Sequence, residues 1–331
     1  MDLERLASTL AERGEPGYRA KQIWEWAANG VASWEGMTNL PQGLREDLAR
    51  ELPLSSLEIE GTAHSDDGTE KTLFQTHDRR PVETVLMRYR DGRRSVCLSS
   101  QSGCPLECSF CATGQMAFGR NLTASEILDQ ALHFRRSEPV TNAVFMGMGE
   151  PMLNLDSVIA ACEKLPDVGI ATSHTTVSTV GWAPGIERLA TEGPRVRLAL
   201  SMHAAEQDLR QELMPTNERY PLTEVIDACL HWHRERKRKV YIEYLMLGGL
   251  NDDPAQAVAL AETLKPREVF KVNLIPYNPT SDGRYRGSTP EAIDAFAEVL
   301  RARKLPTTVR LTRGRDIAAA CGQLAADLSP A

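Results

Sequence analysis

Three cysteines stand within eight residues of one another in the stretch Gln101-Ser-Gly-Cys104-Pro-Leu-Glu-Cys108-Ser-Phe-Cys111. Thiolates at this spacing can bind one face of an iron-sulfur cluster, and a fourth cysteine is expected nearby if protein is to bind every iron. No such cysteine lies nearby in the sequence. A structural zinc site also takes four ligands, and the closest downstream histidine, His133, falls on a predicted helix. The stretch therefore favours a cluster with one open iron, and zinc or free thiols are the alternatives.

A disulfide interpretation of this stretch is weak, because the local cysteine count is odd and Met1-Asp-Leu-Glu-Arg5 lacks the apolar run of a signal peptide. Seven cysteines without an export signal fit a reducing compartment. No run approaches the roughly 18 apolar residues that a membrane helix needs. We therefore expect a cytoplasmic protein that has no membrane partner.

The composition bounds the domain count and the kind of partner. With 331 residues, 42% hydrophobic and 25% charged, the chain can form one large domain with one or two small appendages. Its formal net charge of −7 argues against a uniformly basic nucleic-acid-binding protein. Any RNA site must then be a local patch.

Residues 1–55 predict a small helical module. Apolar residues repeat at helical spacing from Tyr18 to Ala28, Asn29-Gly30 ends that segment, and a further helix fits Leu40 to Leu52. The module also holds residues that could contact RNA, although aromatic residues at helical spacing can equally form a core: Arg19, Lys21, Trp24, Trp26 and Trp34.

Residues 56–94 predict a β-meander that leads into the core. Alternating residues are interrupted by turn chemistry at Asp66-Asp67-Gly68, at His77-Asp78-Arg79-Arg80 and at Asp91-Gly92. The region is rich in arginines, namely Arg79, Arg80, Arg88, Arg90, Arg93 and Arg94. We favour phosphate contact for them over a solvated sheet edge.

From residue 95 to residue 331, strand and helix signals alternate. Strands fit near 95–99, 142–147, 174–180, 196–202, 239–247 and 268–276, and helices near 123–137, 155–165, 184–192, 222–236, 254–265 and 289–303. Thr123-Ala-Ser-Glu126 is a capping box that opens the first of these helices. Six βα repeats predict an α/β fold with a parallel sheet, as an open or closed barrel whose site lies at the C-terminal ends of the strands.

The spacing CxxxCxxC followed by an aromatic-rich segment resembles the radical S-adenosylmethionine (SAM) superfamily. Four further segments look like the RNA adenine-C2 methyltransferases of the RlmN type, whose Cfr-type C8 relatives share much of the pattern. These segments are Val96-Cys97-Leu-Ser-Ser-Gln-Ser-Gly-Cys104, Phe145-Met-Gly-Met-Gly-Glu150-Pro151, Leu274-Ile-Pro-Tyr-Asn278-Pro279 and Thr312-Arg-Gly-Arg-Asp-Ile-Ala-Ala-Ala-Cys321-Gly-Gln-Leu. The resemblance runs from about Tyr18 to Leu324 and implies a partial six-unit barrel with an accessory RNA-binding domain before it.

The resemblance also implies the cofactors and the residues that hold them. Cys104, Cys108 and Cys111 would bind a 4Fe-4S cluster, and its open iron would bind the amino and carboxylate groups of SAM. The positions that match SAM contacts of the family are Gly149, Glu150, Ser178, Ser201, Met202, His203 and Asn278. From the residues alone, a lone serine or histidine at a strand end is more often a local cap.

Two further cysteines have covalent roles in the family. Cys321 would accept a methyl group from one SAM, and a 5′-deoxyadenosyl radical from a second SAM would remove a hydrogen atom from it. The resulting carbon radical would add to adenine C2. Cys97 would then attack the Cys321 sulfur, release the RNA and leave a disulfide for an outside reductant. Glu83 in Val82-Glu-Thr matches the position of the base, whereas Cys162 and Cys229 match no motif and are predicted to be packing thiols.

The expected function is radical SAM-dependent methylation of adenine C2 in 23S ribosomal RNA and in transfer RNA. A Cfr-type C8 methyltransferase would use the same two cysteines, and residue chemistry does not separate the two carbons. An RNA-binding protein with a cluster but without catalysis is a third possibility, against which Cys97 and Cys321 argue together. We expect a monomer that receives electrons from an outside donor such as flavodoxin or ferredoxin.

Overall fold

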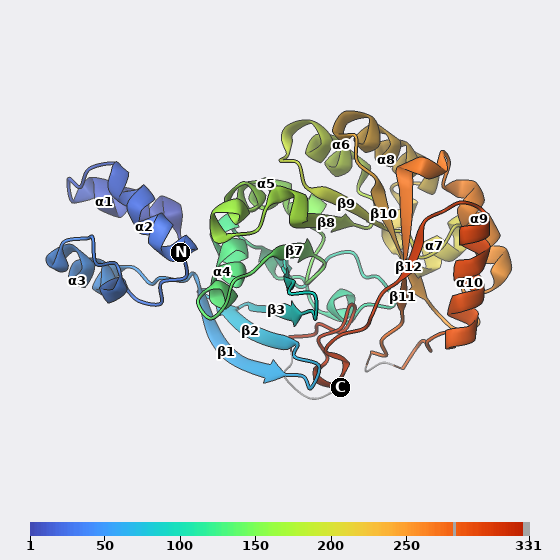
Figure 1. The fold of residues 1–331 in the computed structure, drawn as a ribbon, viewed down its shortest axis with the longest axis horizontal. Helices are drawn as coiled ribbons and strands as arrows, with labels where there is room; N and C mark the ends of the chain where they lie inside the picture. The colour runs from blue at the N-terminus through green and yellow to red at the C-terminus, as the bar shows by residue number, and fades with distance from the viewer. Residues whose placement is uncertain (281–282, 327–331) are drawn as a thin grey trace.

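Three short helices open the chain and stand to one side of the rest of the molecule (Figure 1). The computed structural model describes residues 1–280 and 283–326. The helices are α1 (Leu3–Glu12), α2 (Tyr18–Ala28) and α3 (Gln42–Glu51). Trp24 and Trp34 are buried, with exposed fractions of 6% and 5%, and Trp24 Nε1 donates to Asp167 after α5 at 2.7 Å. The core interpretation of these two tryptophans is therefore confirmed, and they do not offer a stacking surface to RNA.

An antiparallel meander follows, made of β1 (Leu57–His64), β2 (Glu70–Thr76) and β3 (Pro81–Arg88), and β4 (Arg94–Cys97) pairs antiparallel with β3. Its turns fall at the predicted Asp-Gly positions, where Gly68 and Gly92 have φ values of +84° and +90°. Glycine adopts this left-handed conformation without the penalty of a Cβ atom. The meander that the sequence predicted is thus present.

From β4 onward, each new strand of the main sheet is parallel to its neighbour. The order is β1-β2-β3-β4-β7-β8-β9-β10-β11-β12, so each connection leads to the adjacent position. The parallel strands after β4 are β7 (Asn142–Phe145), β8 (Thr175–Thr179), β9 (Arg197–Ser201), β10 (Val240–Met246), β11 (Phe270–Pro276) and β12 (Thr307–Val309). The connecting helices are α4 (Ala124–Arg135), α5 (Leu155–Lys164), α6 (Ala183–Glu192), α7 (Gln207–Leu213), α8 (Leu222–Arg236), α9 (Pro254–Thr263) and α10 (Pro290–Ala302).

The sheet is a partial barrel, because β1 and β12 end its order and do not pair with each other in the described part of the chain. The helices α4, α5, α6, α8, α9 and α10 lie around its outside (Figure 1). A separate two-stranded sheet of β5 (Gln101–Ser102) and β6 (Arg120–Asn121) brackets the three cysteines. The expected α/β partial six-unit barrel is confirmed.

The segment 310–326 after β12 crosses back over the open side of the barrel toward the meander. Ser65 Oγ donates to Asp316 Oδ1 at 2.6 Å, the Ala112 amide donates to the Gly322 carbonyl at 2.8 Å, and Thr113 Oγ1 donates to the Leu324 carbonyl at 2.6 Å. These contacts hold the C-terminal segment against both the meander and the cysteine stretch. Cys321 is thereby brought inside the barrel.

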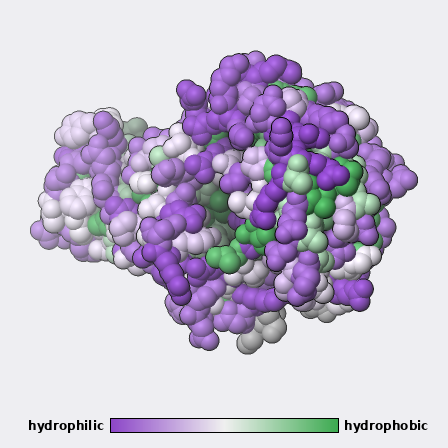
Figure 2. All heavy atoms as spheres, turned by 45° about the vertical axis from the view of Figure 1, so that its right-hand side comes forward, coloured by the Kyte–Doolittle hydropathy of each residue, from purple (hydrophilic) through white to green (hydrophobic). Residues whose placement is uncertain are grey.

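Most apolar side chains between the sheet and its helices are buried, and Cys162 and Cys229 are fully buried among them. The packing interpretation of these two thiols is confirmed. On the face shown in Figure 2, hydrophobic side chains also gather in and beside a central hollow. None of the described helices is long and apolar enough to cross a membrane.

Each predicted strand and helix of the barrel is present within a few residues of its expected limits. The capping box also forms, since Thr123 Oγ1 accepts from the Glu126 amide and the Glu126 carboxylate accepts from the Thr123 amide. The predictions missed the helices α1 and α7 and the short strands β5, β6 and β12.

Candidate active site

The three clustered cysteines line one cavity of about 150 Å³ at the C-terminal ends of the parallel strands. Gly103 has φ of +75°, and a Cβ atom there would lie 2.4 Å from the Ala117 carbonyl oxygen, so the loop closes only with glycine at this position. Within the loop the Cys111 amide donates to the Cys108 carbonyl at 3.1 Å. We call this space the larger cavity.

Burial raises the pKa of all three thiols, to about 12 for Cys104 and well above the ordinary value for Cys108. Neighbouring thiolates raise the pKa further, because like charges repel. A bound cation would reverse this effect, since coordination removes the thiol proton outright. The cysteines therefore form a site that is stable as thiolates only with metal present.

The donor set fits an iron-sulfur cluster. Within residues 1–280 and 283–326, no three histidine, cysteine or carboxylate side chains converge closely enough to hold one metal ion. A 4Fe-4S cluster does not need ligands that converge on one metal ion, because it binds one soft thiolate at each of several separate irons. Three thiols spread over the wall of one cavity provide that arrangement.

Glu150 follows β7 and faces the same cavity. Its Oε1 accepts from the Met152 amide and its Oε2 from the Val180 amide, both at 3.0 Å. Burial raises the pKa of this carboxyl to about 7. Gly149 beside it has φ of +96°, and a Cβ atom there would lie 2.5 Å from the Gln101 side chain. The turn thus fixes a carboxylate that can accept hydrogen bonds from an ammonium group.

Ser178, Ser201 and His203 line the same cavity from the next two strands. The two serine hydroxyls are 3.5 Å apart. His203 Nδ1 accepts from the Leu245 amide at 3.0 Å, and burial lowers the pKa of its ring to about 3. The ring is therefore neutral with its proton on Nε2, which makes it a hydrogen-bond donor. Met202 differs from these residues, because its side chain is buried in the main core and does not line the cavity.

A smaller cavity of about 40 Å³ lies beside the larger one and is lined by both Cys97 and Cys321. Cys321 also lines the larger cavity, so this residue stands at the junction of the two spaces. Burial raises the pKa of Cys97 to about 12, and the Cys321 thiolate adds to the effect. Both thiols are free.

Asn278 after β11 lines the smaller cavity and contacts the segment that carries Cys321. Its Nδ2 donates to the Cys321 carbonyl at 3.4 Å. Its Oδ1 is buried and has no hydrogen-bond partner among the described residues. A buried acceptor without a partner is costly, so this atom is suited to accept from a bound ligand.

Two residues of the site escaped the sequence analysis. Glu243 on β10 lines the larger cavity, Arg310 after β12 lines the smaller one, and their side chains pair at 3.2 Å. Burial alone would lower the pKa of Arg310, but the charges of Glu243, Cys321 and Tyr89 together outweigh burial and raise that pKa. A glutamate inside the apolar strand Val240–Met246 was the available signal, because charged residues are rarely buried without a partner.

Glu83 lies under the C-terminal segment and is fully buried. Its Oε1 is 3.0 Å from Lys71 Nζ, and its Oε2 accepts from the Ala326 amide at 3.0 Å. Lys71 Nζ also donates to the Ala318 carbonyl. Burial raises the pKa of Glu83, and Lys71 opposes that shift. The pair therefore holds both sides of the segment that carries Cys321, and Glu83 does not line either cavity.

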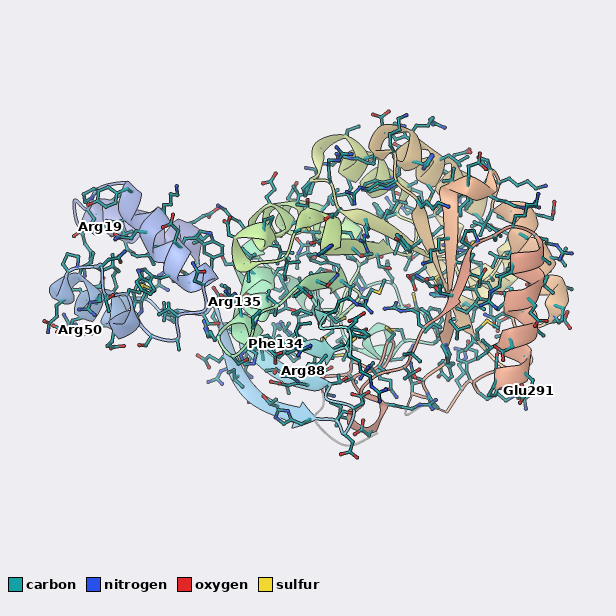
Figure 3. The ribbon with its side chains drawn as sticks, in the orientation of Figure 1. Arg19, Arg50, Arg88, Phe134, Arg135 and Glu291 are labelled. Carbon is teal, nitrogen blue, oxygen red and sulfur yellow. The ribbon has the colours of Figure 1, made fainter. Side chains whose placement is uncertain are left out.

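The phosphate interpretation of the meander arginines is wrong for two of them. Arg88 pairs with Glu70 and with Glu138, each at 2.7 Å, and Arg94 pairs with Glu138 at 2.6 Å. These guanidinium groups are half-buried and neutralised within the fold, so they are not a track for phosphate. In Figure 3, Arg88 lies at the sheet, whereas Arg19 and Arg50 lie on the N-terminal helices.

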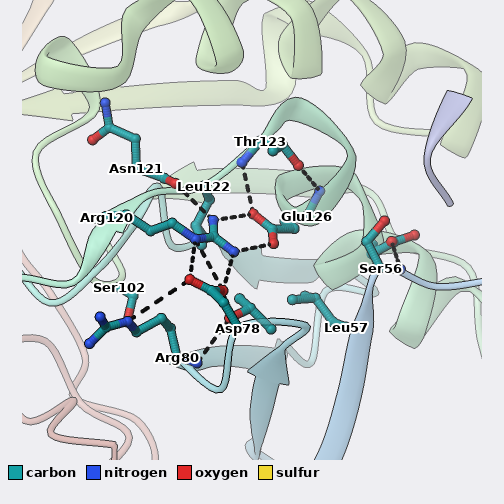
Figure 4. Close-up of polar contacts among 12 residues, drawn as sticks. Ser56, Leu57, Asp78, Arg80, Ser102, Arg120, Asn121, Leu122, Thr123 and Glu126 are labelled. Atoms are coloured by element: carbon teal, nitrogen blue, oxygen red, sulfur yellow. Dashed lines mark hydrogen bonds and ion pairs between the residues drawn. The ribbon is translucent and has the colours of Figure 1, made fainter. Parts of the chain in front are cut away.

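A separate ion-pair network fixes the end of the cysteine stretch (Figure 4). Arg120 on β6 pairs with Asp78 in the β2–β3 turn and with Glu126 on α4, both at 2.7 Å. Its guanidinium lowers the pKa of Asp78 well below the ordinary range. Because β6 pairs with β5, the network ties the strand before the cysteines to the barrel.

Comparison with known families divides the chain into two matches. Residues 98–261 match the radical SAM superfamily, and residues 1–53 match the N-terminal domain of ribosomal RNA large subunit methyltransferases.

Individual proteins are similar over nearly the whole chain. A probable dual-specificity RNA methyltransferase RlmN from Gemmatimonas aurantiaca is 47% identical, over 97% of this chain and 90% of the relative. A dual-specificity RNA methyltransferase RlmN from Anaeromyxobacter dehalogenans is 42% identical, over 99% of this chain and 91% of the relative. The crystal structure of a radical SAM methyltransferase from Sphaerobacter thermophilus superposes with a TM-score of 0.92 at 44% identity, covering 99% of this chain and 98% of that one.

Proposed function

The chain belongs to the family of RlmN dual-specificity RNA methyltransferases, and from this premise we propose that it methylates C2 of adenine in 23S ribosomal RNA and in transfer RNA. The enzyme uses a 4Fe-4S cluster and SAM, as the radical SAM superfamily does. The C8 alternative is not favoured, since the similar proteins are RlmN methyltransferases.

One observation carries the mechanism, namely that Cys321 lines both cavities. From the larger cavity its sulfur can be reached by SAM at the cluster, and from the smaller cavity it can be reached by Cys97 and by a substrate. A residue that accepts a carbon atom in the larger cavity and passes it to a substrate in the smaller cavity must lie at the junction of the two.

In this proposal Cys104, Cys108 and Cys111 hold the cluster. Glu150 accepts hydrogen bonds from the ammonium group of SAM, and Gly149 lets the cofactor approach the backbone. Ser178, Ser201 and His203 contribute polar atoms around it in the larger cavity. Asn278 contributes its unpaired Oδ1 from the smaller cavity, and Met202 supports Ser201 and His203 from the core. Together the bound cluster and SAM supply the methyl group and the radical chemistry that activates it.

Cys321 accepts the methyl group on sulfur and presents the carbon to adenine C2, which is electrophilic and resists ordinary methyl transfer. Cys97 then attacks the Cys321 sulfur. A disulfide forms, the bond between sulfur and the transferred carbon breaks, and the methylated RNA is released. The proton on C2 and one electron must leave the adduct in the same sequence, and we propose Glu83 as the acceptor of the proton and the oxidised cluster as the acceptor of the electron. An outside reductant reopens the disulfide.

The parts around the site have roles in the same proposal. Residues 1–55 form the accessory RNA-binding domain, residues 56–94 extend the sheet, and residues 95–331 form the catalytic barrel. We propose that the enzyme acts as a cytoplasmic monomer, where ribosomal and transfer RNA are accessible. Its electrons come from an outside donor such as flavodoxin or ferredoxin.

Nucleoside mass spectrometry tests the function. Ribosomal and transfer RNA are incubated with reconstituted enzyme, SAM and a reductant, then digested and analysed for methyladenosine isomers. We expect 2-methyladenosine in both RNAs and none with Cys321→Ala. Formation of 8-methyladenosine would instead identify a C8 enzyme, and unmodified RNA with a fully loaded enzyme would contradict catalysis.

A further inference from the structure

A buried arginine lies near the cysteine stretch and does not itself line the larger cavity, although it donates to the carbonyl of Val180, which does. Arg210 is on α7, whose last residue, Leu213, accepts from the Ser109 amide at 3.0 Å. Ser109 directly follows Cys108, so α7 packs against the loop that would hold the cluster. Only 1% of Arg210 is exposed. Its guanidinium is therefore a full positive charge inside the protein, next to the cysteines.

Its hydrogen-bond partners are neutral. One terminal nitrogen donates to the Asn217 side-chain oxygen, the other donates to the Val180 carbonyl, and Nε has no partner among the described residues. No carboxylate in the described part of the chain lies within ion-pair distance of Arg210, whereas two other buried cations, Lys71 and the Met1 amino group, pair with Glu83 and Asp129. Among the described residues, Arg210 is thus a buried charge without a counter-ion.

Such a charge costs free energy unless an anion compensates it. Burial lowers the pKa of Arg210 to about 10, and the groups that oppose this shift are the thiols of Cys108 and Cys229. Cys229 is buried in the main core, where burial raises the pKa of its thiol and keeps it neutral. Cys108 lines the larger cavity. The negative charge that Arg210 needs must then come from the cavity.

We propose that Arg210 is the counter-charge of the iron-sulfur cluster and raises its reduction potential, a positioning and tuning role that rests on the proposed function. A cluster held by three thiolates carries net negative charge, and reduction adds one more electron to it. A fixed positive charge stabilises the reduced form more than the oxidised form, and net charge and hydrogen bonding are known determinants of cluster potentials. Arg210 therefore makes electron uptake easier.

Arg210 has a second effect that the test must separate from its charge. The Val180 carbonyl accepts from Arg210, while the Val180 amide donates to Glu150 at 3.0 Å. Losing the arginine could therefore shift Glu150 as well as remove the charge. Arg210→Gln keeps a donor for Val180 without the charge, and Arg210→Lys keeps the charge with a different hydrogen-bond geometry.

The experiment is a redox titration of the reconstituted full chain without SAM, followed by electron paramagnetic resonance. We expect Arg210→Gln to make reduction about tenfold less favourable, which shifts the midpoint by about 59 mV to more negative values. Arg210→Lys should keep the midpoint of the wild type. An unchanged midpoint in Arg210→Gln with full cluster content would overturn the proposal.

A second variant keeps the test decisive if Arg210→Gln does not fold. Asn217→Asp places a carboxylate at the guanidinium and neutralises it within the fold. It should raise the melting temperature of the cluster-free protein, because the guanidinium gains a counter-ion, and it should lower the midpoint, which a purely structural role for Arg210 would not predict. A midpoint equal to that of the wild type would reject the proposal. Iron and sulfide analysis of the same samples separates this outcome from failure of the proposed function, in which the wild type itself would hold no cluster.

Discussion

Cys97 at the end of β4 and Cys321 in the C-terminal segment line the same small cavity, and the charge of Cys321 adds to the burial that raises the pKa of Cys97. In sequence, they lie near the two ends of the barrel domain, residues 95–331. Two free thiols that are far apart in sequence and line one cavity are the arrangement from which exchange through sulfur can start.

We expect Cys97→Ala to accumulate a covalent adduct between protein and RNA. The variant should still accept a methyl group on Cys321 and couple the carbon to adenine, but it lacks the thiol that breaks the bond. The adduct is detected as a shifted band on denaturing gels with labelled RNA. Peptide mapping of that band then identifies the linked residue. The adduct should require SAM, the cluster and Cys321.

Two variants serve as controls for the adduct. Cys321→Ala and the double variant Cys97→Ala/Cys321→Ala should give neither adduct nor product. Normal turnover by Cys97→Ala would overturn the role of that residue, and activity of Cys321→Ala would show that the methyl group passes directly from SAM to RNA.

We expect Cys104→Ala, Cys108→Ala and Cys111→Ala each to abolish the cluster, because loss of one thiolate leaves a second iron without a protein ligand. Iron and sulfide analysis after anaerobic reconstitution provides the measurement. Cys162→Ala is a matched control, since that thiol is buried in the core away from the cavity. Full occupancy in any of the three variants, or stoichiometric zinc in the wild type, would refute the assignment.

The fold was predictable because the alternation of strands and helices is a local signal. Segments such as Val240–Met246 and Leu222–Arg236 are long and strongly patterned, so their neighbours in sequence suffice to identify them. Helix α7 was missed because it has seven residues, mostly polar, and depends on its packing against the cysteine loop. β12 has three residues and depends on pairing with β11.

The site was predictable only where a motif marks it. The cysteine stretch could be recognised by its spacing, and the Gly-Glu turn after β7 by its resemblance to a known family. The pair Glu243–Arg310 and the buried Arg210 could not be recognised, because their environment is set by partners that are distant in sequence. The pairing of Arg88 with Glu138 was hidden for the same reason, and a dense arginine run looked like a phosphate site.

We expect the affinity for SAM to rise with pH between pH 6 and pH 8. Burial raises the pKa of Glu150 to about 7, so the carboxyl is mostly protonated at pH 6 and mostly ionised at pH 8. Only the ionised form carries the negative charge that strengthens hydrogen bonds from an ammonium group, so binding should be up to about tenfold weaker at pH 6 than at pH 8. Calorimetric titration of the reconstituted protein measures this.

Glu150→Gln is the control for that pH dependence. The amide cannot ionise, while titration of SAM itself is common to both proteins, so the difference between the two profiles isolates Glu150. Parallel profiles would contradict contact between Glu150 and the cofactor.

We expect Arg88→Met to lower the free energy of unfolding by about 1 to 2 kcal/mol, because Glu70 and Glu138 lose a half-buried partner. Urea denaturation followed by tryptophan fluorescence provides the measurement. Arg90→Met, at an exposed position two residues further on, should change stability by less than about 0.5 kcal/mol. If Arg88→Met were as stable as the wild type, the ion pairs of Arg88 would not stabilise the fold, and phosphate contact would again be a candidate role for this residue.

The role of Glu83 as the base is tested by Glu83→Gln, which keeps the shape of the side chain and an acceptor for the Ala326 amide. The amide cannot take up the C2 proton, so we expect this variant to accumulate the same adduct as Cys97→Ala. Lys71→Met is the comparison variant, because it breaks the buried pair of 3.0 Å but leaves the carboxyl in place. It should destabilise the segment that carries Cys321 and slow turnover without accumulating the adduct. Release of methylated RNA at the normal rate by Glu83→Gln would exclude the base role and leave Glu83 with the task of holding that segment.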